Sequence, residues 1–132
     1  MNRVYLAGPP FADEYRRRAA ALARERGWEP IDPMRRDFRG GTQGHEAEIV
    51  GGDLEDIDSC TTVLAAFTAP DEGTAMEAWY AHSNGTPVVV YTGGTPPHRG
   101  LSTSPAPFMP RSTMRLLLRA RALRTPACRS NA

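Results

Sequence analysis

Two carboxylates in this sequence occupy stretches whose other residues are mostly apolar. Glu77 lies in PDEGTAMEAWYA, residues 70–81, and Asp53 interrupts an apolar stripe in the segment 46–59. An ionised carboxylate on a buried face is costly unless it is paired, hydrogen-bonded or protonated. Two carboxylates that flank a glycosidic bond can cleave it, because one attacks the anomeric carbon while the other handles the proton of the leaving group. The pattern therefore favours a glycosyl-transfer site for a neutral sugar or nucleoside.

Each carboxylate also has a purely structural explanation. Thr74 and Glu77 have the spacing of a capping box, in which the two side chains satisfy backbone donors at the start of a helix. Asp53 could instead cap its helix or pair with an arginine at the rim of the apolar stripe. Against the capping box, the residues around Glu77 are apolar on almost every side, which predicts a helix packed between layers. Glu77 would then face the strand ends, where the helix N-terminus favours an ionised nucleophile.

The segment 46–59 has an acidic face as well as an apolar one. At about 100° per residue, an apolar stripe about 140° wide is formed by Ile49, Val50, Leu54 and Ile57. Asp56 falls at the edge of this stripe, and Glu48, Glu55 and Asp58 lie opposite it. We therefore expect a solvated acidic face, with Asp53 as the exception.

Apolar runs alternate with helical segments over the first two thirds of the chain. The predicted strands cover residues 3–7, 28–33, 61–67 and 86–91, and the predicted helices cover 13–26, 46–59 and 74–84. Continuously apolar strands that alternate with helices indicate a parallel sheet covered on both faces. We predict an open three-layer α/β sandwich with a mostly parallel, flavodoxin- or Rossmann-like sheet. Such sheets bind ligands at the carboxyl ends of their strands, so the loops after Ala7, Ile31 and Phe67 should converge on one site.

Composition narrows the class of protein further. The chain has 132 residues, enough for one domain, and no run of about 18 apolar residues that would span a membrane. Its two cysteines and three histidines lack metal-ligand spacing, and a GxxxxGK[ST] phosphate loop is absent. We expect a cytoplasmic, nucleoside-binding catalytic domain at residues 1–92, without metal or cofactor, that binds neither membranes nor nucleic acid polymers.

Residues 93–132 have a different character and are rich in proline, serine and arginine. All 15 acidic residues lie at or before Glu77, whereas 7 of the 16 arginines follow it. Proline-rich sequence without apolar periodicity favours irregular or disordered structure, and residues 111–124 could form a short basic helix. The arginines lack the aromatic or motif context of a nucleic-acid arm, so the sequence favours a solvated tail.

Four stretches, taken in order, resemble the nucleoside 2-deoxyribosyltransferase family. They are VYLAGPPF, IDPMRRDFRG, GDLEDIDSCTTVLAAF and PDEGTAMEAWYA, and the resemblance covers roughly Val4 to Tyr91. The order and spacing of the set carry the resemblance, more than any single motif does. The resemblance implies an enzyme that transfers 2-deoxyribose between nucleobases through a covalent deoxyribosyl-glutamate, with hydrolysis as a side reaction.

The resemblance also implies roles for individual residues. Glu77 would be the nucleophile, and Tyr5, on the first strand, would hydrogen-bond to it and orient it. Asp53 would lie on the base-binding side and help to protonate the departing base, and Asp71 would contact the nucleoside. Asp37 stands where the family has a base-recognising polar residue. The remaining substrate-binding positions are Gly8, Phe11 and Met76.

The partners that the resemblance implies are deoxynucleosides, free nucleobases and further copies of the chain in a homo-oligomer. Two other functions stay open: an N-glycosidase that hydrolyses the same bond in a (deoxy)nucleoside or nucleoside 5′-monophosphate, and a non-catalytic nucleotide-sensing domain. Asp71 and Glu72 would repel a phosphate dianion, which favours a free nucleoside. After Tyr91 we find no match to the family, whose members continue with residues that complete a neighbouring subunit's site.

Overall fold

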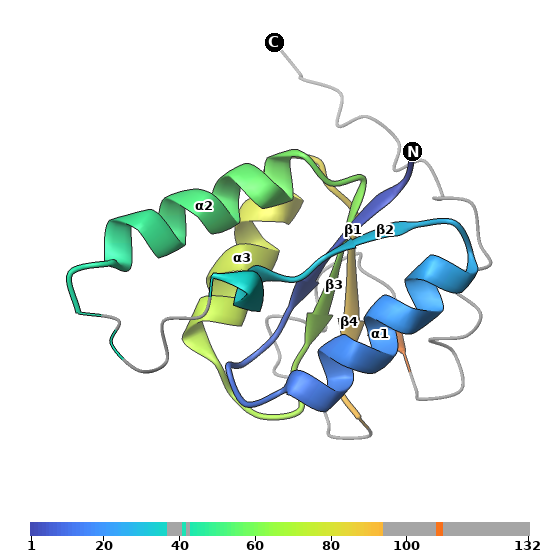
Figure 1. The fold of residues 1–132 in the computed structure, drawn as a ribbon, viewed down its shortest axis with the longest axis horizontal. Helices are drawn as coiled ribbons and strands as arrows, with labels where there is room; N and C mark the ends of the chain where they lie inside the picture. Colours follow the sequence, from blue (N-terminus) through green and yellow to red (C-terminus); the bar gives the residue numbers. More distant parts are fainter. Residues whose placement is uncertain (37–40, 42, 94–107, 110–132) are drawn as a thin grey trace, which may run out of the picture.

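A five-stranded parallel sheet forms the centre of the protein (Figure 1). The computed structural model describes residues 1–36, 41 and 43–93, together with the strand at 108–109. The strands are β1 (Arg3–Ala7), β2 (Glu29–Ile31), β3 (Thr62–Ala66), β4 (Val88–Tyr91) and β5 (Phe108–Met109). Their order is β2-β1-β3-β4-β5, and every neighbouring pair is parallel. This is the flavodoxin-like order, which changes direction between β1 and β3, and such sheets bind ligands at that point.

Helices cover both faces of the sheet and make it the middle of three layers (Figure 1). α1 (Asp13–Glu25) packs on one face, while α2 (Glu46–Asp58) and α3 (Glu72–Ser83) pack together on the other. A 3-10 turn, η1 (Pro33–Arg35), follows β2. The predicted three-layer α/β class is confirmed. No helix in the described part of the chain is both long enough and apolar enough to cross a membrane.

Alternation along β1 divides the core into two halves. Val4 and Leu6 pack with α1, whereas Tyr5 and Ala7 pack on the side of α2 and α3, because successive residues of a strand point to opposite faces. All four side chains are buried. Tyr5 therefore carries its hydroxyl into the core between the sheet and the helices α2 and α3.

Most elements lie where the sequence predicted them, with ends that differ by a residue or two. β5 was not predicted, since the last predicted strand ends at Tyr91. A two-residue strand carries no alternation that a sequence pattern can reveal. The basic helix predicted at 111–124 lies outside the described residues, and the division of the chain at residue 92 stays a prediction.

α3 differs from the prediction in how much of its surface is buried. It was expected to be packed between layers, but only Thr74, Ala78 and Ala81 are buried, while Met76 is 66% exposed and Trp79 71% exposed. The expectation was wrong because α3 belongs to an outer layer, in which a helix buries one side only.

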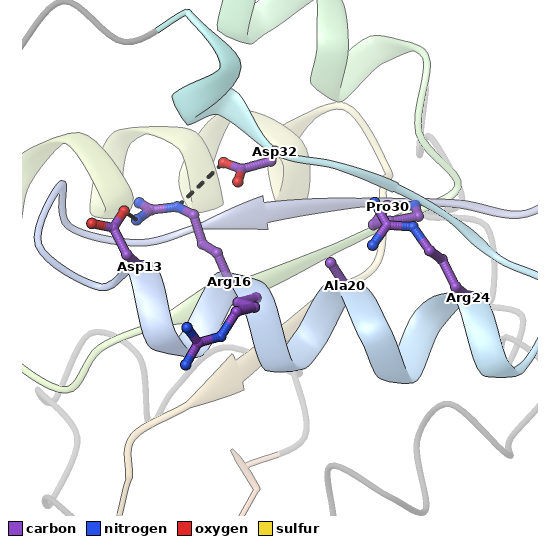
Figure 2. Close-up of a pocket in the computed structure, with 7 residues that line it drawn as sticks. Asp13, Arg16, Ala20, Arg24, Pro30 and Asp32 are labelled. Atoms are coloured by element: carbon purple, nitrogen blue, oxygen red, sulfur yellow. Dashed lines mark ion pairs between the residues drawn. The ribbon is translucent and has the colours of Figure 1, made fainter.

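Arg16 connects α1 to the loop that follows β1. The residue is only 2% exposed, and its Nη2 donates hydrogen bonds to the carbonyl oxygens of Gly8 and, at 2.9 Å, of Pro9. Its Nε lies 3.6 Å from a carboxylate oxygen of Asp32, just after β2 (Figure 2). Arg16 therefore ties the loop after β1 to the end of β2. The open depression of about 390 Å³ beside it includes none of the predicted site residues.

Replacing Arg16 by methionine should destabilise the protein, because the carbonyls of Gly8 and Pro9 lose a buried donor. We expect the free energy of unfolding to fall by about 2 kcal/mol, since a hydrogen bond to a charged group contributes roughly 1.5–3 kcal/mol. Urea denaturation followed by circular dichroism measures the change. Arg17→Met, an exposed position on the same helix, is the matched control and should change stability by less than about 0.5 kcal/mol. Equal losses in the two variants would contradict a special role for Arg16.

Candidate active site

Asp71 fixes the start of α3 and so determines where Glu77 lies. One Asp71 carboxylate oxygen, Oδ2, accepts hydrogen bonds from the Thr74 amide at 2.8 Å and from the Thr74 hydroxyl at 2.6 Å. Asp71 is therefore the N-cap, and Thr74 is a buried residue of the first turn. The capping-box explanation of Glu77 is wrong, because Thr74 does not occupy the capping position. No part of the Glu77 carboxylate is needed to complete the helix start.

Partial burial of Glu77, on α3, decides its ionisation. Burial raises the pKa of Glu77 to about 8, the charge of Asp53 adds to this rise, and the Tyr5 hydroxyl opposes it. Glu77 is therefore mainly protonated at neutral pH in the free protein. The expectation that the helix N-terminus keeps it ionised is wrong here, because Glu77 lies beyond the first turn of α3, where the helix dipole is weak.

Tyr5 lies between the two carboxylates that the sequence singled out. Burial, together with the charges of Glu77 and Asp53, raises the pKa of the Tyr5 hydroxyl, so the phenol stays protonated and can act as a hydrogen-bond donor. This hydroxyl is buried and makes no hydrogen bond of ordinary length to any described residue. Its polar interaction with each carboxylate nevertheless favours the ionised carboxylate.

Asp53 reaches the same place from α2. Its side chain is 13% exposed, and Arg36 Nη1 lies 3.6 Å from its Oδ1. Burial raises the pKa of Asp53 to about 6, and the positive charge of Arg36 limits the rise. The alternative in which Asp53 pairs with an arginine is therefore confirmed. The pairing does not remove Asp53 from the site, because the same carboxylate also interacts with Tyr5 and Glu77.

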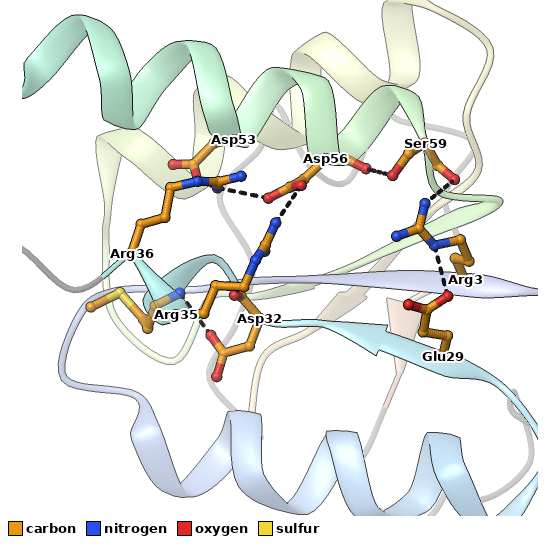
Figure 3. Close-up of polar contacts among 9 residues, drawn as sticks. Arg3, Glu29, Asp32, Arg35, Arg36, Asp53, Asp56 and Ser59 are labelled. Atoms are coloured by element: carbon orange, nitrogen blue, oxygen red, sulfur yellow. Dashed lines mark hydrogen bonds and ion pairs between the residues drawn. The ribbon is translucent and has the colours of Figure 1, made fainter.

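Asp56 is a buried carboxylate that the sequence analysis missed. It is 8% exposed, and it accepts hydrogen bonds from Arg35 Nη2 at 2.5 Å and from Arg36 Nη1 at 2.8 Å (Figure 3). Burial alone would raise the pKa of Asp56, but the hydrogen bonds from Arg36 and Arg35 outweigh it and lower the pKa. The prediction of a solvated position was wrong because these two arginines, which end η1 and follow it, cover this turn of α2.

Two other predicted residues border the site but are engaged in holding the fold. Asp71 is near enough to Glu77 for its charge to raise the pKa of that glutamate, yet its carboxylate serves as the N-cap of α3. Gly8 presents its carbonyl oxygen to Arg16. A contact of Asp71 or Gly8 with substrate stays a prediction.

Phe11 and Met76, the predicted pocket-lining residues, are 71% and 66% exposed, so both side chains lie mainly in solvent in the free protein. Asp37, the predicted base-recognising residue, lies outside the described residues. Their roles also stay predictions. Over the part of the chain that the structure describes, no group of three or more His, Cys, Asp or Glu side chains is arranged to hold a metal ion.

Two carboxyl groups of unlike pKa thus interact with one phenol. Environments that push apart the pKa values of neighbouring carboxyl groups are what separates an acid from a base in active sites. The strand order makes this an α/β protein. The grouping of Glu77, Asp53 and Tyr5 in it suits glycosyl chemistry. A family model described as nucleoside 2-deoxyribosyltransferase matches residues 4–110. The chain belongs to this family, whose enzymes act on N-glycosidic bonds.

The family match continues past Tyr91, where the sequence analysis found no further resemblance, and it includes β5. The expectation that the match ends there was therefore wrong. The family model includes the segment between β4 and β5, whose proline-rich composition obscures the resemblance. Among curated proteins, none matches the sequence.

Solved structures that share the fold include the following two. One is a 2-deoxyribosyltransferase from the psychrotolerant bacterium Bacillus psychrosaccharolyticus, with a TM-score of 0.74 and 19% identity, over 91% of this chain and 93% of that chain. The other is a CMP N-glycosidase from Clostridium botulinum, with a TM-score of 0.60 and 20% identity, over 89% of this chain and 96% of that chain. The first protein is a transferase and the second a glycosidase, so likeness of fold alone does not choose between the reactions.

Replacing Glu77 by glutamine should stabilise the protein at high pH. The pKa of Glu77 is about 8 in the folded protein and has its ordinary value of 4.5 in the unfolded chain, so the unfolded chain releases its proton first and wild type loses stability progressively between pH 4.5 and pH 8. We expect Glu77→Gln to be more stable than wild type at pH 9, by up to about 5 kcal/mol, and equally stable at pH 4. Urea unfolding at both pH values measures the difference. A difference that is the same at both would show that Glu77 is not a buried acid.

Proposed function

We propose that the protein transfers 2-deoxyribose from one nucleobase to another through a covalent intermediate on Glu77. The observation that supports this most directly is a pair of carboxyl groups, Glu77 and Asp53, that both interact with one tyrosine hydroxyl. Membership of the family supplies the type of bond. The carboxyl pair supplies the nucleophile and the proton donor that cleavage of this bond requires.

The first half-reaction breaks the bond between C1′ and the base. A Glu77 oxygen gives an electron pair to C1′ as the C1′–N bond breaks, and the base leaves with the electrons of that bond and takes a proton from Asp53. The products are a deoxyribosyl ester of Glu77 and a free base. In the second half-reaction another base attacks C1′, returns its proton to Asp53 and releases Glu77 as a carboxylate.

The sugar makes this route accessible. A 2-deoxyribosyl centre lacks the electron-withdrawing 2′-hydroxyl, so positive charge develops at C1′ more easily, and an ionised glutamate stabilises that charge. Water that attacks the ester in place of a base gives free deoxyribose, which is the expected side reaction.

One proton shared by the two carboxyl groups is enough for this cycle. At pH 7 the free protein mainly holds the proton on Glu77, because Glu77 has the higher pKa. The reactive form has the same total charge but carries the proton on Asp53, and in it the Tyr5 hydroxyl donates to the Glu77 carboxylate and orients it. Since the pair titrates in two steps, kcat/KM should follow a bell-shaped curve with limbs near pH 6 and pH 8.

A free nucleoside is the substrate that the site favours over a nucleotide. Asp71 and Glu72 lie at the start of α3 and would repel a phosphate dianion. Hydrolysis of the same bond is the second candidate function, and the likeness to the CMP N-glycosidase supports it. Assembly into a homo-oligomer and a cytoplasmic location stay predictions of the sequence analysis.

Transfer can be separated from hydrolysis in one incubation. The protein is mixed with deoxyadenosine and an excess of a second free base, and the products are separated by liquid chromatography. A new deoxynucleoside means transfer, and free deoxyribose without a new nucleoside means hydrolysis. Binding of the nucleoside without any turnover would support a non-catalytic sensing domain and would contradict the proposal.

Glu77→Ala should abolish both transfer and hydrolysis, with a loss of at least about 10³-fold in kcat, because it removes the carboxylate that forms the ester. Mass spectrometry of the wild-type protein with a 2-fluoro-deoxynucleoside should show a sugar adduct on the peptide that contains Glu77. An unchanged circular dichroism spectrum of the variant serves as the control for folding. Activity within about tenfold of wild type would exclude Glu77 as the nucleophile.

Asp53→Asn should slow the poorest leaving-group bases most, because these depend most on protonation as they depart. In the same variant the bell-shaped curve should become a single rise with pH. Its midpoint should lie below 8, since the variant lacks the negative charge that helps to raise the pKa of Glu77. The pH dependence of kcat/KM for a series of nucleosides measures both effects. Equal slowing of every base would argue against a proton-donating role.

A further inference from the structure

A second layer of charge lies behind Asp53, and the mechanism above does not use it. Asp56 is buried, and the guanidinium groups of Arg35 and Arg36 converge on it (Figure 3). Arg36 is shared between two carboxylates, because the Nη1 that donates to Asp56 at 2.8 Å also lies 3.6 Å from Asp53 Oδ1. The buried carboxylate thus acts as an anchor for the arginine that faces the proposed proton donor.

Gly52 fixes where this arginine can lie. A Cβ at Gly52 would stand 2.8 Å from Arg36 Cζ and 2.9 Å from Arg36 Nε, so the guanidinium rests directly on the backbone of α2. Glycine is a poor helix former, and its use in the middle of α2 is explained by this close approach. At the neighbouring Gly51, no described atom outside the adjacent residues and the local helix backbone lies within 4 Å of the corresponding position.

We propose that Arg36 is a positioning residue for Asp53. Anchored by Asp56 and seated on Gly52, its guanidinium holds the Asp53 carboxylate beside Tyr5 and limits how tightly that carboxylate keeps its proton. The inference rests on the proposed function, in which Asp53 gives a proton to the departing base and takes one back from the incoming base. Without the guanidinium, Asp53 holds its proton more tightly and releases it less readily.

The charges around Asp53 give the sign of the effect. The titratable and charged groups that act on it are Arg35 and Arg36 from η1 and the residue after it, Asp56 from α2, Tyr5 from β1 and Glu77 from α3. Among these, Arg36 is the strongest influence that favours the ionised form. Removal of Arg36 therefore leaves burial and the negative neighbours unopposed, and the pKa of Asp53 rises.

The test is a titration of the full-length protein without substrate, so that its outcome does not depend on activity. The protein is labelled with 13C at the aspartate carboxyl carbons, and Asp53→Asn identifies the Asp53 signal. In wild type we expect a midpoint near 6. In Arg36→Gln the midpoint should rise by roughly 1 pH unit, as expected for loss of a close opposite charge.

Two glycine variants test whether the position of the Arg36 guanidinium matters, in addition to its charge. Gly52→Ala keeps the arginine but pushes its guanidinium off the helix, so the Asp53 midpoint should rise in the same direction as in Arg36→Gln. Gly51→Ala adds the same methyl group one residue earlier, where nothing is in contact, and should leave the midpoint within about 0.2 pH units of wild type. Both changes replace glycine by a better helix former, so neither should unfold α2.

Kinetics with a deoxynucleoside then report the consequence for the reaction. Arg36→Gln and Gly52→Ala should lower kcat roughly tenfold, with a much smaller change in KM, and move the lower limb of the pH curve upward. Arg36→Lys, which keeps the charge, should recover part of the loss. If the wild-type protein neither transfers nor hydrolyses, the proposed function fails while the titration still decides the role of Arg36. An Asp53 midpoint that is unchanged in both Arg36→Gln and Gly52→Ala overturns the inference.

Discussion

Two partly buried carboxylates beside one phenol cannot both be ionised at low cost, and this electrostatic constraint organises the site. Because burial weighs more on Glu77 than on Asp53, their pKa values separate to about 8 and about 6. Near neutral pH the pair holds one proton, mainly on Glu77 in the free protein, and the proposed reaction uses the form in which that proton lies on Asp53. Tyr5 is suited to stand between them, because its own high pKa keeps its hydrogen available to either neighbour.

The architecture brings these three groups together from three separate elements. β1 is buried on both faces, so its alternation sends Tyr5 into the layer between the sheet and the helices. α3 packs against that layer through small buried residues, Ala78 and Ala81, and supplies Glu77. α2 supplies Asp53 and is itself held by the arginines that follow β2. The site therefore depends on packing between layers, as well as on the loops at the strand ends.

Local patterns in the sequence predicted the elements well and drew attention to the two carboxylates. Glu77 and Asp53 stand out because each interrupts an apolar face, which is a local signal. The grouping of Asp56 with Arg35 and Arg36 could not be predicted in this way, because the partners lie some twenty residues apart and on different elements. The only trace of it in the sequence is an adjacent arginine pair placed before an acidic helix.

The ionisation of Glu77 and the exposure of α3 were missed for a related reason. Helix position favours an anion and burial opposes it, and only coordinates show which effect is larger at residue 77. The apolar residues of α3 suggest a helix buried on all sides, yet Trp79 is 71% exposed because no element in the described part of the chain covers it. Both errors concern the depth of a side chain, which sequence periodicity does not measure.

The cap at the start of α3 has a consequence for substrate choice. Free amide groups at a helix N-terminus are a natural seat for a phosphate. Here a carboxylate already occupies this position, because Asp71 accepts hydrogen bonds from the Thr74 amide and hydroxyl. A phosphate that bound there would have to displace the side chain of Asp71, whereas an uncharged sugar would not.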